Sequence, residues 1–416
     1  MSSRVQSAFY IMLGGSVVLT IALGIRHGFG LFLTPMSNEF GWGRETFALA
    51  IALQNLIWGL TQPLTGALAD RIGAKKVVLA GGLCYAAGLI TMAMASSGIT
   101  LALSAGLLIG LALSGTSFTI ILGAIGRAVP VEKRSMAMGI ASAAGSFGQF
   151  IMLPGTLALI TQLGWAAALT ALGMLALLIL PLALMLRAPD THTHTGPEQS
   201  IEQALRQAVA HKGFWLLSLG FFVCGFQVVF IGIHLPAYLV DQQLAPAVGT
   251  TVLALIGLFN IFGTYTAGAL GARLSKPLLL SALYALRAVV IVAFLLLPLT
   301  NWSAYLFGMA MGLLWLSTVP LTNGTVASIF GVRYLSMLGG IVFLFHQLGA
   351  FLGGWFGGYV YDKTGNYDLV WQIAIGLSII AALLNLPVKE HSAALLTLLI
   401  IFRVVHFGKN RLFAVA

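Results

Sequence analysis

Apolar runs of about twenty residues recur from one end of the chain to the other, and this repetition limits its possible folds more than any other feature. Each run is long enough to cross, as a helix, a hydrocarbon core about 30 Å thick. Charged residues make up only 8% of the chain, whereas a soluble domain carries about 25%. The sequence therefore predicts an all-α polytopic membrane protein.

The apolar runs and the Gly, Pro and charged breaks between them predict twelve transmembrane helices. Their expected ranges are 8–34, 46–68, 76–97, 99–126, 135–160, 164–187, 213–239, 249–271, 277–298, 302–327, 335–360 and 369–388. The first run lacks a small-residue cleavage site, which favours a retained helix over a signal peptide. Apart from Arg44, Lys363 and two arginines within spans, the Lys and Arg residues share the side of the N-terminus. This asymmetry predicts that both termini are cytoplasmic, in the cell inner membrane.

The longest polar stretch, 188–212, divides the chain into two six-helix bundles, 1–187 and 213–390. It contains THTHT, which we interpret as a cytoplasmic linker and not as a metal site. The tail, 391–416, has an apolar run too short to span comfortably and a basic end, which is typical of an interfacial segment. The two cysteines lie in apolar segments, so we expect no disulfide, no metal and no cofactor. The basic residues indicate membrane orientation, and nucleic acid is not an expected partner.

The two halves resemble each other at an offset of about 200 residues. GALADRIGAK at Gly66 recurs as GALGARLSKP at Gly268, and SMAMGI at Ser135 recurs as SMLGGI at Ser336. Such internal symmetry is typical of transporter folds built from repeats. The sequence therefore predicts two pseudo-symmetric bundles related by a parallel repeat.

The loop after the second expected helix carries a specific motif, G-x-x-x-D-R-x-G-x-K-K, and on it the chain resembles the major facilitator superfamily. The resemblance implies a cytoplasmic gate formed by Gly66, Asp70, Arg71, Gly73, Lys75 and Lys76. Gly66 permits close helix contact and Gly73 a tight turn, while Asp70 is placed to accept from amides at the start of a helix near Ser336. Alternatively, the basic residues only mark topology. The second repeat has Ala272 in place of Asp70, so only one half carries the complete motif.

One arginine lies deep within the first apolar run. Burying the charge of Arg26, in GIRHGFG, costs several kcal/mol without water or a partner. All eleven acidic residues fall at helix ends, in loops or in the tail, so no carboxylate lies at its depth. The first helix lines the central cavity in the superfamily, so we expect Arg26 to bind a small organic anion bidentately. Alternatively, Arg26 faces the outer vestibule or bonds backbone carbonyls and only shapes the helix.

Further polar residues on the expected helices complete a candidate site. We expect the substrate to contact Arg26, His27, Gln54, Asn55, Trp58, Ser117, Gln149, Gln227, Asn260, Arg287, Asn323, His346 and Gln347. Each alone could be a helix-packing contact. Arg287 lies in a helix that is peripheral in the superfamily, so a structural polar bridge is its alternative. A histidine could carry a coupling proton, and His346 is the best placed.

Buried cations without buried carboxylates resemble the monocarboxylate and organic-anion branches of the superfamily. The chain departs from those branches in the eighth helix, where Thr264 and Asn260 replace their arginine and acidic residue. We predict a monomeric secondary transporter that moves a small organic anion across the bilayer by alternating access, with proton symport as the favoured coupling. The alternatives are drug or metabolite efflux and a membrane receptor without transport. No nucleophile triad or Walker loop indicates an enzyme or an ATP-driven pump.

Overall fold

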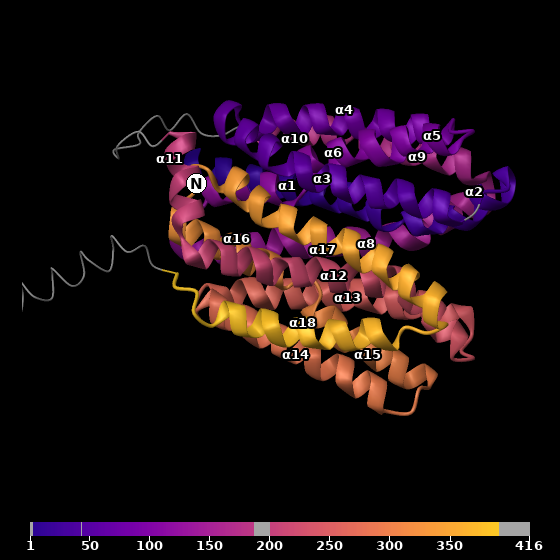
Figure 1. Cartoon of the computed structure of the whole chain (residues 1–416). Coiled ribbons are helices and arrows are strands. Elements are labelled where there is room, and N and C mark those ends of the chain that lie inside the picture. Colours follow the sequence, from indigo (N-terminus) through magenta and orange to yellow (C-terminus); the bar gives the residue numbers. More distant parts are fainter. Residues whose placement is uncertain (1–2, 43, 187–199, 391–416) are drawn as a thin grey trace, which may run out of the picture.

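The computed structural model describes residues 3–42, 44–186 and 200–390, and in these ranges the chain is a bundle of long helices (Figure 1). Eleven helices in the described residues are long and apolar enough to cross a membrane. The twelfth segment is α3 (Arg44–Ile72), whose 29 residues are also long enough at about 1.5 Å per residue. The all-α, twelve-helix fold predicted from the sequence is therefore confirmed.

The first half of the chain supplies six spans. The first span is α1 (Ser3–His27), which is followed by the short helices η1 (Phe29–Phe32) and α2 (Leu33–Phe40). The second and third spans are α3 and α4 (Ala74–Ala93), and the fourth is formed by α5 (Gly98–Leu101), η2 (Ala102–Leu108), α6 (Ile109–Thr116) and α7 (Phe118–Ala128). The fifth is α8 (Val131–Leu163), and the sixth is formed by α9 (Trp165–Ala176) and α10 (Ile179–Leu184).

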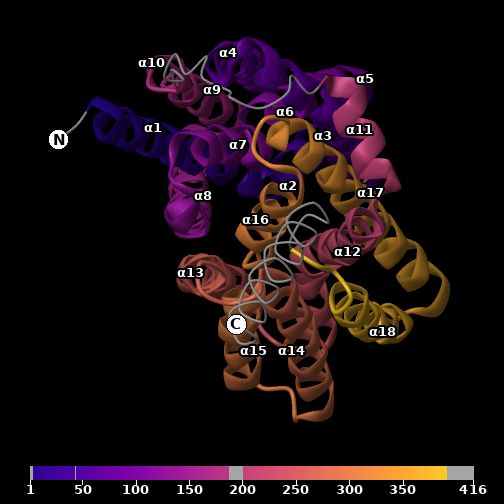
Figure 2. The same cartoon turned by 90° about the vertical axis from the view of Figure 1, so that its left-hand side faces the viewer.

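The second half repeats this order. It consists of α12 (Lys212–Asp241), α13 (Pro246–Gly271), α14 (Lys276–Leu296), a fourth span formed by α15 (Asn301–Leu314) and α16 (Thr318–Phe330), α17 (Leu335–Thr364) and α18 (Asp368–Asn385). Figure 2 shows the helices of the first half gathered on one side and those of the second half on the other.

Several spans are less regular than the sequence predicts. The first helix ends at His27 and not near residue 34, because the chain turns at Gly28 into η1. The fourth span contains a π-helical stretch, η2, and breaks at Ser117, whose backbone is extended. The tenth span breaks between Leu314 and Thr318. These breaks leave main-chain groups without helical partners in the interior, where side chains can reach them.

Part of the expected linker is helical. The helix α11 (Ile201–Ala210) begins at Ser200, whose side chain accepts from the Gln203 amide while Gln203 bonds back to the Ser200 amide. This reciprocal capping stabilises the first turn, and Ala204 and Ala208 form its buried face. The THTHT tract and the tail, 391–416, lie outside the described residues.

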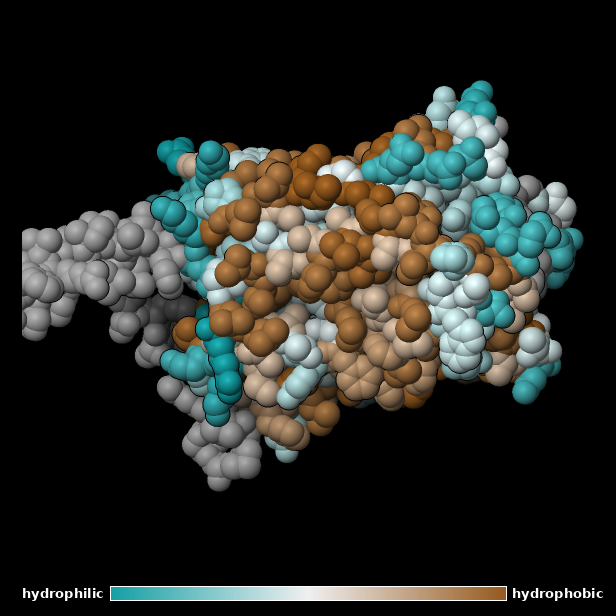
Figure 3. All heavy atoms as spheres, turned by 90° about the horizontal axis from the view of Figure 1, so that it is seen from below, coloured by the Kyte–Doolittle hydropathy of each residue, from teal (hydrophilic) through white to brown (hydrophobic). Residues whose placement is uncertain are grey.

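The outer surface agrees with a membrane location. Figure 3 shows, on the face in view, a broad hydrophobic band across the middle of the molecule with hydrophilic residues toward both ends. Large apolar side chains of the spans, such as Leu64, Leu278 and Leu383, are exposed. A surface of this kind suits contact with lipid tails, which solvate apolar side chains as well as a protein interior does.

Glycines bring corresponding helices of the two halves into close contact. A Cβ on Gly148 of α8 would collide with the Thr20 carbonyl of α1, and a Cβ on Gly349 of α17 would collide with the Phe222 carbonyl of α12. The two pairs occupy equivalent positions of the repeat. The repeat is therefore visible in packing as well as in sequence, since it pairs α1 with α8 in the first half and α12 with α17 in the second.

Candidate functional site

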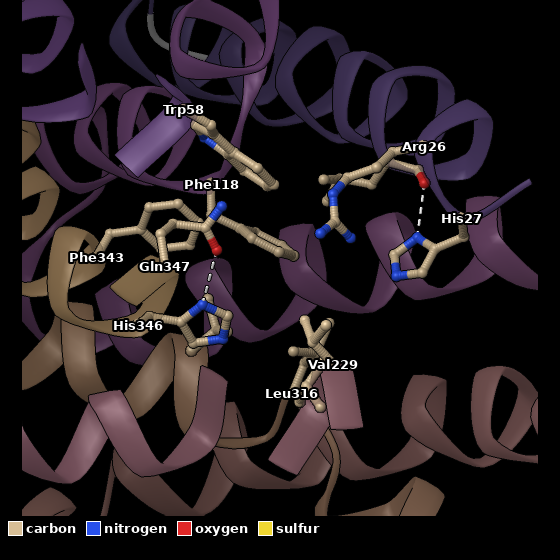
Figure 4. A pocket seen from close by; sticks show the side chains of 12 residues that line it. Arg26, His27, Trp58, Phe118, Val229, Leu316, Phe343, His346 and Gln347 are labelled. Carbon is tan, nitrogen blue, oxygen red and sulfur yellow. Dashed lines mark hydrogen bonds between the residues drawn. The ribbon is translucent and has the colours of Figure 1, made fainter. Parts of the chain in front are cut away.

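A pocket lies between the two halves, with about 430 Å³ of atom-free space including the solvent at its mouth. Its lining comes from both halves: Leu23, Arg26, His27, Trp58, Phe118, Val228, Val229, Leu316, Val319, Phe343, His346 and Gln347. Figure 4 shows Arg26 and His27 facing His346 and Gln347 across this space. Helix α1 therefore supplies the cation of the pocket, and α17 supplies the polar groups opposite.

Arg26 retains donors that no protein group uses. Its Nη2 donates to Asn55 Oδ1 at 2.7 Å, and its Cζ lies 5.0 Å from the centre of the Trp58 ring. Its Nε has no partner, and none of the ion pairs among the described residues includes it. Arg26 as a residue is half-buried and its Nε is buried, so an anion in the pocket could use donors that are already out of bulk water.

A chain of amides joins Arg26 to the second half of the molecule. Gln347 Nε2 donates to Asn55 Oδ1 at 3.3 Å, and Gln347 Oε1 lies 3.0 Å from His346 Nδ1. Asn55, Gln347 and His346 are all buried. The polar contacts of Arg26 therefore extend from α1 through α3 to α17.

The remaining walls of the pocket are apolar or aromatic. Phe343 lies 4.8 Å from Trp58, ring centre to ring centre, and stacks on His346 at 5.2 Å. The indole nitrogen of Trp58 donates to Gln62 Oε1 at 2.8 Å and to Ser117 Oγ at 3.2 Å. These bonds hold the indole in place behind Arg26, so the ring is a fixed wall of the pocket.

His27 lines the pocket but bonds within its own helix. Its Nδ1 lies 2.6 Å from the Leu23 carbonyl, the residue one turn earlier. Figure 4 shows its ring beside the Arg26 guanidinium. The structure thus brings Arg26, His27, Trp58, His346 and Gln347 together, with Asn55 directly behind them.

Arg287, expected at the site, is not part of this pocket. Its guanidinium is 1% exposed and donates to the Leu314 carbonyl at 2.6 Å, to the Trp315 carbonyl and to Gln227 Oε1 at 3.2 Å. The two carbonyls end α15, where a helix carries partial negative charge. Arg287 therefore caps the broken tenth span, as in the alternative interpretation of the sequence.

Six neutral residues from the expected site also lie away from the pocket, and five of them have hydrogen-bond partners elsewhere, whereas Gln149 Oε1 is buried without one. Gln54 donates to the Ala105 carbonyl, Ser117 to Gln62, Gln227 to the Ala374 carbonyl and Asn323 to the Val319 carbonyl, while Gln149 lies against Gly257 and Asn260 binds Ser146 and the Leu316 amide. Asn260 still acts on the site indirectly, since the Leu316 that it holds lines the pocket. Polarity within a span could not distinguish such contacts from pocket contacts.

The motif loop makes a clasp between the halves, on the side of the molecule where the N-terminus lies (Figure 1). Asp70 Oδ2 accepts from the Met337 amide at 2.8 Å, in the first turn of α17. Its Oδ1 lies 2.5 Å from Arg127 Nη1 of α7. The Arg127 guanidinium supplies the opposite charge that this buried carboxylate needs, and the Met337 amide supplies a hydrogen bond. Arg127 therefore favours the charged carboxylate in this buried position.

Other motif residues fall into two groups. Gly66 lies so close to α17 that a Cβ would collide with the Ser336 carbonyl, and Gly73 has a φ of 94° that favours glycine. Arg71 and Lys76 are exposed and Lys75 is half-buried, with no ion pair among the described residues. The second repeat makes a simpler contact, in which Ser135 Oγ donates to the Gly268 carbonyl at 3.0 Å.

Sequence reasoning missed Arg127 and most of the apolar lining. A basic residue at the end of the fourth span was a usable signal for Arg127, because a buried Asp70 needs a cation. Nothing in the sequence separates the pocket residues Phe118, Phe343 and Val319 from ordinary core residues. No group of three or more His, Cys, Asp or Glu side chains suited to a metal ion occurs in the part of the chain that the structure describes.

The chain belongs to the Major Facilitator Superfamily, whose family model matches residues 7–354. It is therefore a multi-pass membrane protein and a secondary transporter for a small molecule, and it is not an enzyme. The resemblance inferred from the motif at Gly66–Lys76 is confirmed.

Curated relatives cover most of the chain. YcxA of Bacillus subtilis, described as an uncharacterised MFS-type transporter, is 25% identical and aligns with 88% of this chain and 92% of its own length. Monocarboxylate transporter 11 of Mus musculus is 26% identical over 84% of this chain and 80% of its own. The Escherichia coli transporter YhjX, also described as uncharacterised, is 22% identical over 84% of this chain and 87% of its own.

Solved structures show the same fold. The fucose:proton symporter FucP of E. coli has a TM-score of 0.69 at 15% identity and covers 92% of this chain and 98% of its own. A structure of FucP in the outward conformation has a TM-score of 0.70, with 90% and 97% covered. At this identity the likeness concerns the fold alone.

Proposed function

We propose that the protein moves a small monocarboxylate with an apolar body across the cell inner membrane by alternating access. The observation that carries the proposal is the state of Arg26, a half-buried pocket cation with one side-chain acceptor, Asn55, and an unused Nε. A carboxylate would supply the missing charge and could bind two guanidinium donors at once. The 26% identity to monocarboxylate transporter 11 supports the same substrate class.

The pocket walls favour a single charge on an apolar body. Apart from His346 and Gln347, the lining across from Arg26 is apolar, with side chains such as Phe118, Leu316 and Phe343 that offer no hydrogen bonds. A second carboxylate, or the hydroxyls of a sugar, would lose water there without replacement. We therefore expect benzoate or a branched-chain carboxylate to be a better substrate than succinate or a hexose.

Proton symport is the coupling that suits uptake of such an anion. Importing one negative charge against an inside-negative potential costs about 2.3 kcal/mol per 100 mV, and a proton moving in the same direction cancels that cost. We propose that the Asp70 clasp is the cytoplasmic gate, that both termini are cytoplasmic and that the two bundles of one monomer rock about the pocket.

Drug or metabolite efflux is the second candidate. Its support is the aromatic surface formed by Trp58, Phe118 and Phe343, which would also suit larger apolar compounds. A pump for cationic drugs needs negative charge at its site, and the pocket has Arg26 instead. Uptake of benzoate without transport of an apolar cation such as tetraphenylphosphonium would decide against efflux.

The test is uptake of radiolabelled benzoate into proteoliposomes with an acidic exterior, for the wild type and Arg26→Lys. We expect kcat/KM to fall about ten- to a hundredfold, because hydrogen bonds to charged groups contribute about 1.5–3 kcal/mol and a lysine cannot present the planar fork. The matched control is Arg273→Lys, since Arg273 is exposed in the turn after α13. Equal uptake by all three proteins, at equal amounts in the membrane, would remove Arg26 from the site.

A further inference from the structure

The hydrogen bonds that connect Arg26 to His346 through Asn55 and Gln347 have fixed donors and acceptors. A guanidinium has only donors, so Asn55 Oδ1 accepts from Arg26 at 2.7 Å, and the same oxygen accepts from Gln347 Nε2 at 3.3 Å. That orientation leaves Gln347 Oε1 facing His346 Nδ1 at 3.0 Å, and this oxygen can only accept. The hydrogen of neutral His346 is therefore on Nδ1, and its Nε2 carries the lone pair that can take up a proton.

The surroundings of His346 contain cations and no carboxylate among the described residues. Across the pocket α1 presents Arg26 and His27, and α3 presents only the neutral Trp58. From α12 the buried Cys224 thiol interacts with His346, and behind it lie Arg287 of α14, 3.6 Å from the sulfur, and the neutral Thr318 of α16. The rings of Phe221 and Phe343 flank the imidazole at 4.8 and 5.2 Å.

These charges make proton binding and anion binding depend on each other. An imidazolium at His346 would add a second positive charge to a pocket that already holds Arg26, and like charges repel each other. A carboxylate bound at Arg26 would instead supply a negative charge that attracts the imidazolium. By thermodynamic linkage, each ligand then raises the affinity for the other by the same factor.

We propose that His346 Nε2 is the proton-binding atom of the transport cycle, connected to the anion at Arg26 through Gln347 and Asn55. The inference rests on the proposed function and deepens it by naming the residue that carries the coupling proton. A proton from water on the open side adds to the Nε2 lone pair, while Nδ1–H stays bonded to Gln347 Oε1. It returns to water on the other side, and no other bond is made or broken.

The hydrogen bonds from Arg26 to His346 also cross the interface between the two halves, which must open during transport. Asn55 belongs to α3 of the first half and Gln347 to α17 of the second, and Gln347 Nε2 also donates to the Asn55 carbonyl at 3.3 Å. A carboxylate that draws the Arg26 guanidinium toward the pocket takes one donor from Asn55 Oδ1. Substrate binding thereby alters a bond that links the two bundles, which makes Asn55 and Gln347 positioning residues for the coupled movement.

The first experiment compares two kinds of benzoate transport in proteoliposomes containing wild type or His346→Gln. A glutamine can still donate to Gln347 but cannot take up a proton. We expect accumulation driven by a pH gradient, and the accompanying proton entry, to fall at least tenfold, while exchange of internal for external benzoate falls less than threefold. The matched control is His211→Gln, at the start of α12 and outside the pocket, which should behave as wild type. Accumulation and proton entry at wild-type levels, or an equal loss of exchange and accumulation, would overturn the assignment.

The second experiment needs no substrate. In purified protein labelled with ¹⁵N at histidine, the resonances missing from His346→Gln identify His346. We expect hydrogen on Nδ1 at high pH and uptake of the second proton on Nε2 as the pH is lowered from about 8 to 5. Hydrogen on Nε2 at high pH, or no titration in this range, would overturn the proposal. If wild type shows the expected spectrum but no benzoate transport, the proposed substrate class has failed and the proton site has not.

Discussion

Two arginines within the membrane-spanning helices have different partners, and this difference defines the site. Arg287 donates to the carbonyls of Leu314 and Trp315 and to Gln227, so its charge is balanced by the end of α15. Arg26 donates one hydrogen bond to Asn55 and lies over the face of the Trp58 ring, and its Nε has no hydrogen-bond partner. A cation that the protein already satisfies stabilises the fold, whereas a cation with unused donors beside a pocket is available to a ligand.

Replacing Arg287 should therefore affect stability more than substrate recognition. In Arg287→Lys the ammonium cannot reach the Leu314 carbonyl, the Trp315 carbonyl and Gln227 with the geometry of a guanidinium, and a carbonyl left unpaired in the interior costs about 1–3 kcal/mol. We expect a lower Tm for the purified protein and an unchanged KM for benzoate in the folded fraction. A raised KM at unchanged Tm would instead place Arg287 in the substrate site.

Only part of this residue-level assignment follows from sequence. The absence of acidic residues within the predicted spans was enough to mark Arg26 as unbalanced. The acceptors of Arg287 could not be predicted, because they are main-chain carbonyls exposed by a helix break between Leu314 and Thr318 that the apolar pattern does not show. The aromatic lining was hidden for a similar reason, since Phe118 and Phe343 have the composition of any apolar helix.

At the scale of elements, helices α3, α7 and α17 meet at the clasp. Asp70 joins the end of α3 to the first turn of α17 through the Met337 amide and to the end of α7 through Arg127. Gly66 permits the close approach to Ser336 that these bonds need. The spacing of the motif anticipated the contact near Ser336, but the cation came from a segment more than fifty residues away along the chain.

Neutralising Asp70 should favour opening on this side of the molecule. Asn at position 70 keeps the size of the side chain but loses the ion pair with Arg127, whose charge then lacks a partner in a partly buried place. The measurement is the distance distribution between spin labels on cysteines replacing the exposed Lys76 and Arg273, one in each half, with Cys84 and Cys224 replaced.

We expect Asp70→Asn to shift this distribution toward longer distances. The matched control is Glu202→Gln, which removes an ion pair with Arg206 in which both side chains are more than 80% exposed; exposed pairs contribute little, about 0–1 kcal/mol. Indistinguishable distributions for Asp70→Asn and wild type would mean that the clasp does not hold the halves together.

At the scale of the whole molecule, the repeat explains where the site lies. Corresponding glycine contacts, Gly148 with Thr20 and Gly349 with Phe222, pair α8 with α1 and α17 with α12, and the pocket between the halves takes part of its lining from α1, α12 and α17. The site itself breaks this symmetry, because the position in the second half that corresponds to Arg26 is Val228, an apolar wall of the same pocket. Twelve spans and the repeat were predictable from periodic apolar runs, whereas the pocket depends on how two non-identical bundles meet.

The most direct measurement of the central claim is a structure of the protein with 4-iodobenzoate bound, in which the heavy iodine locates the ligand. We expect the carboxylate oxygens at about 2.7–2.9 Å from the Arg26 guanidinium nitrogens, the usual distance for charged hydrogen bonds, and the ring between Phe118 and Phe343. A ligand bound elsewhere, with Arg26 still bonded only to Asn55, would contradict the account.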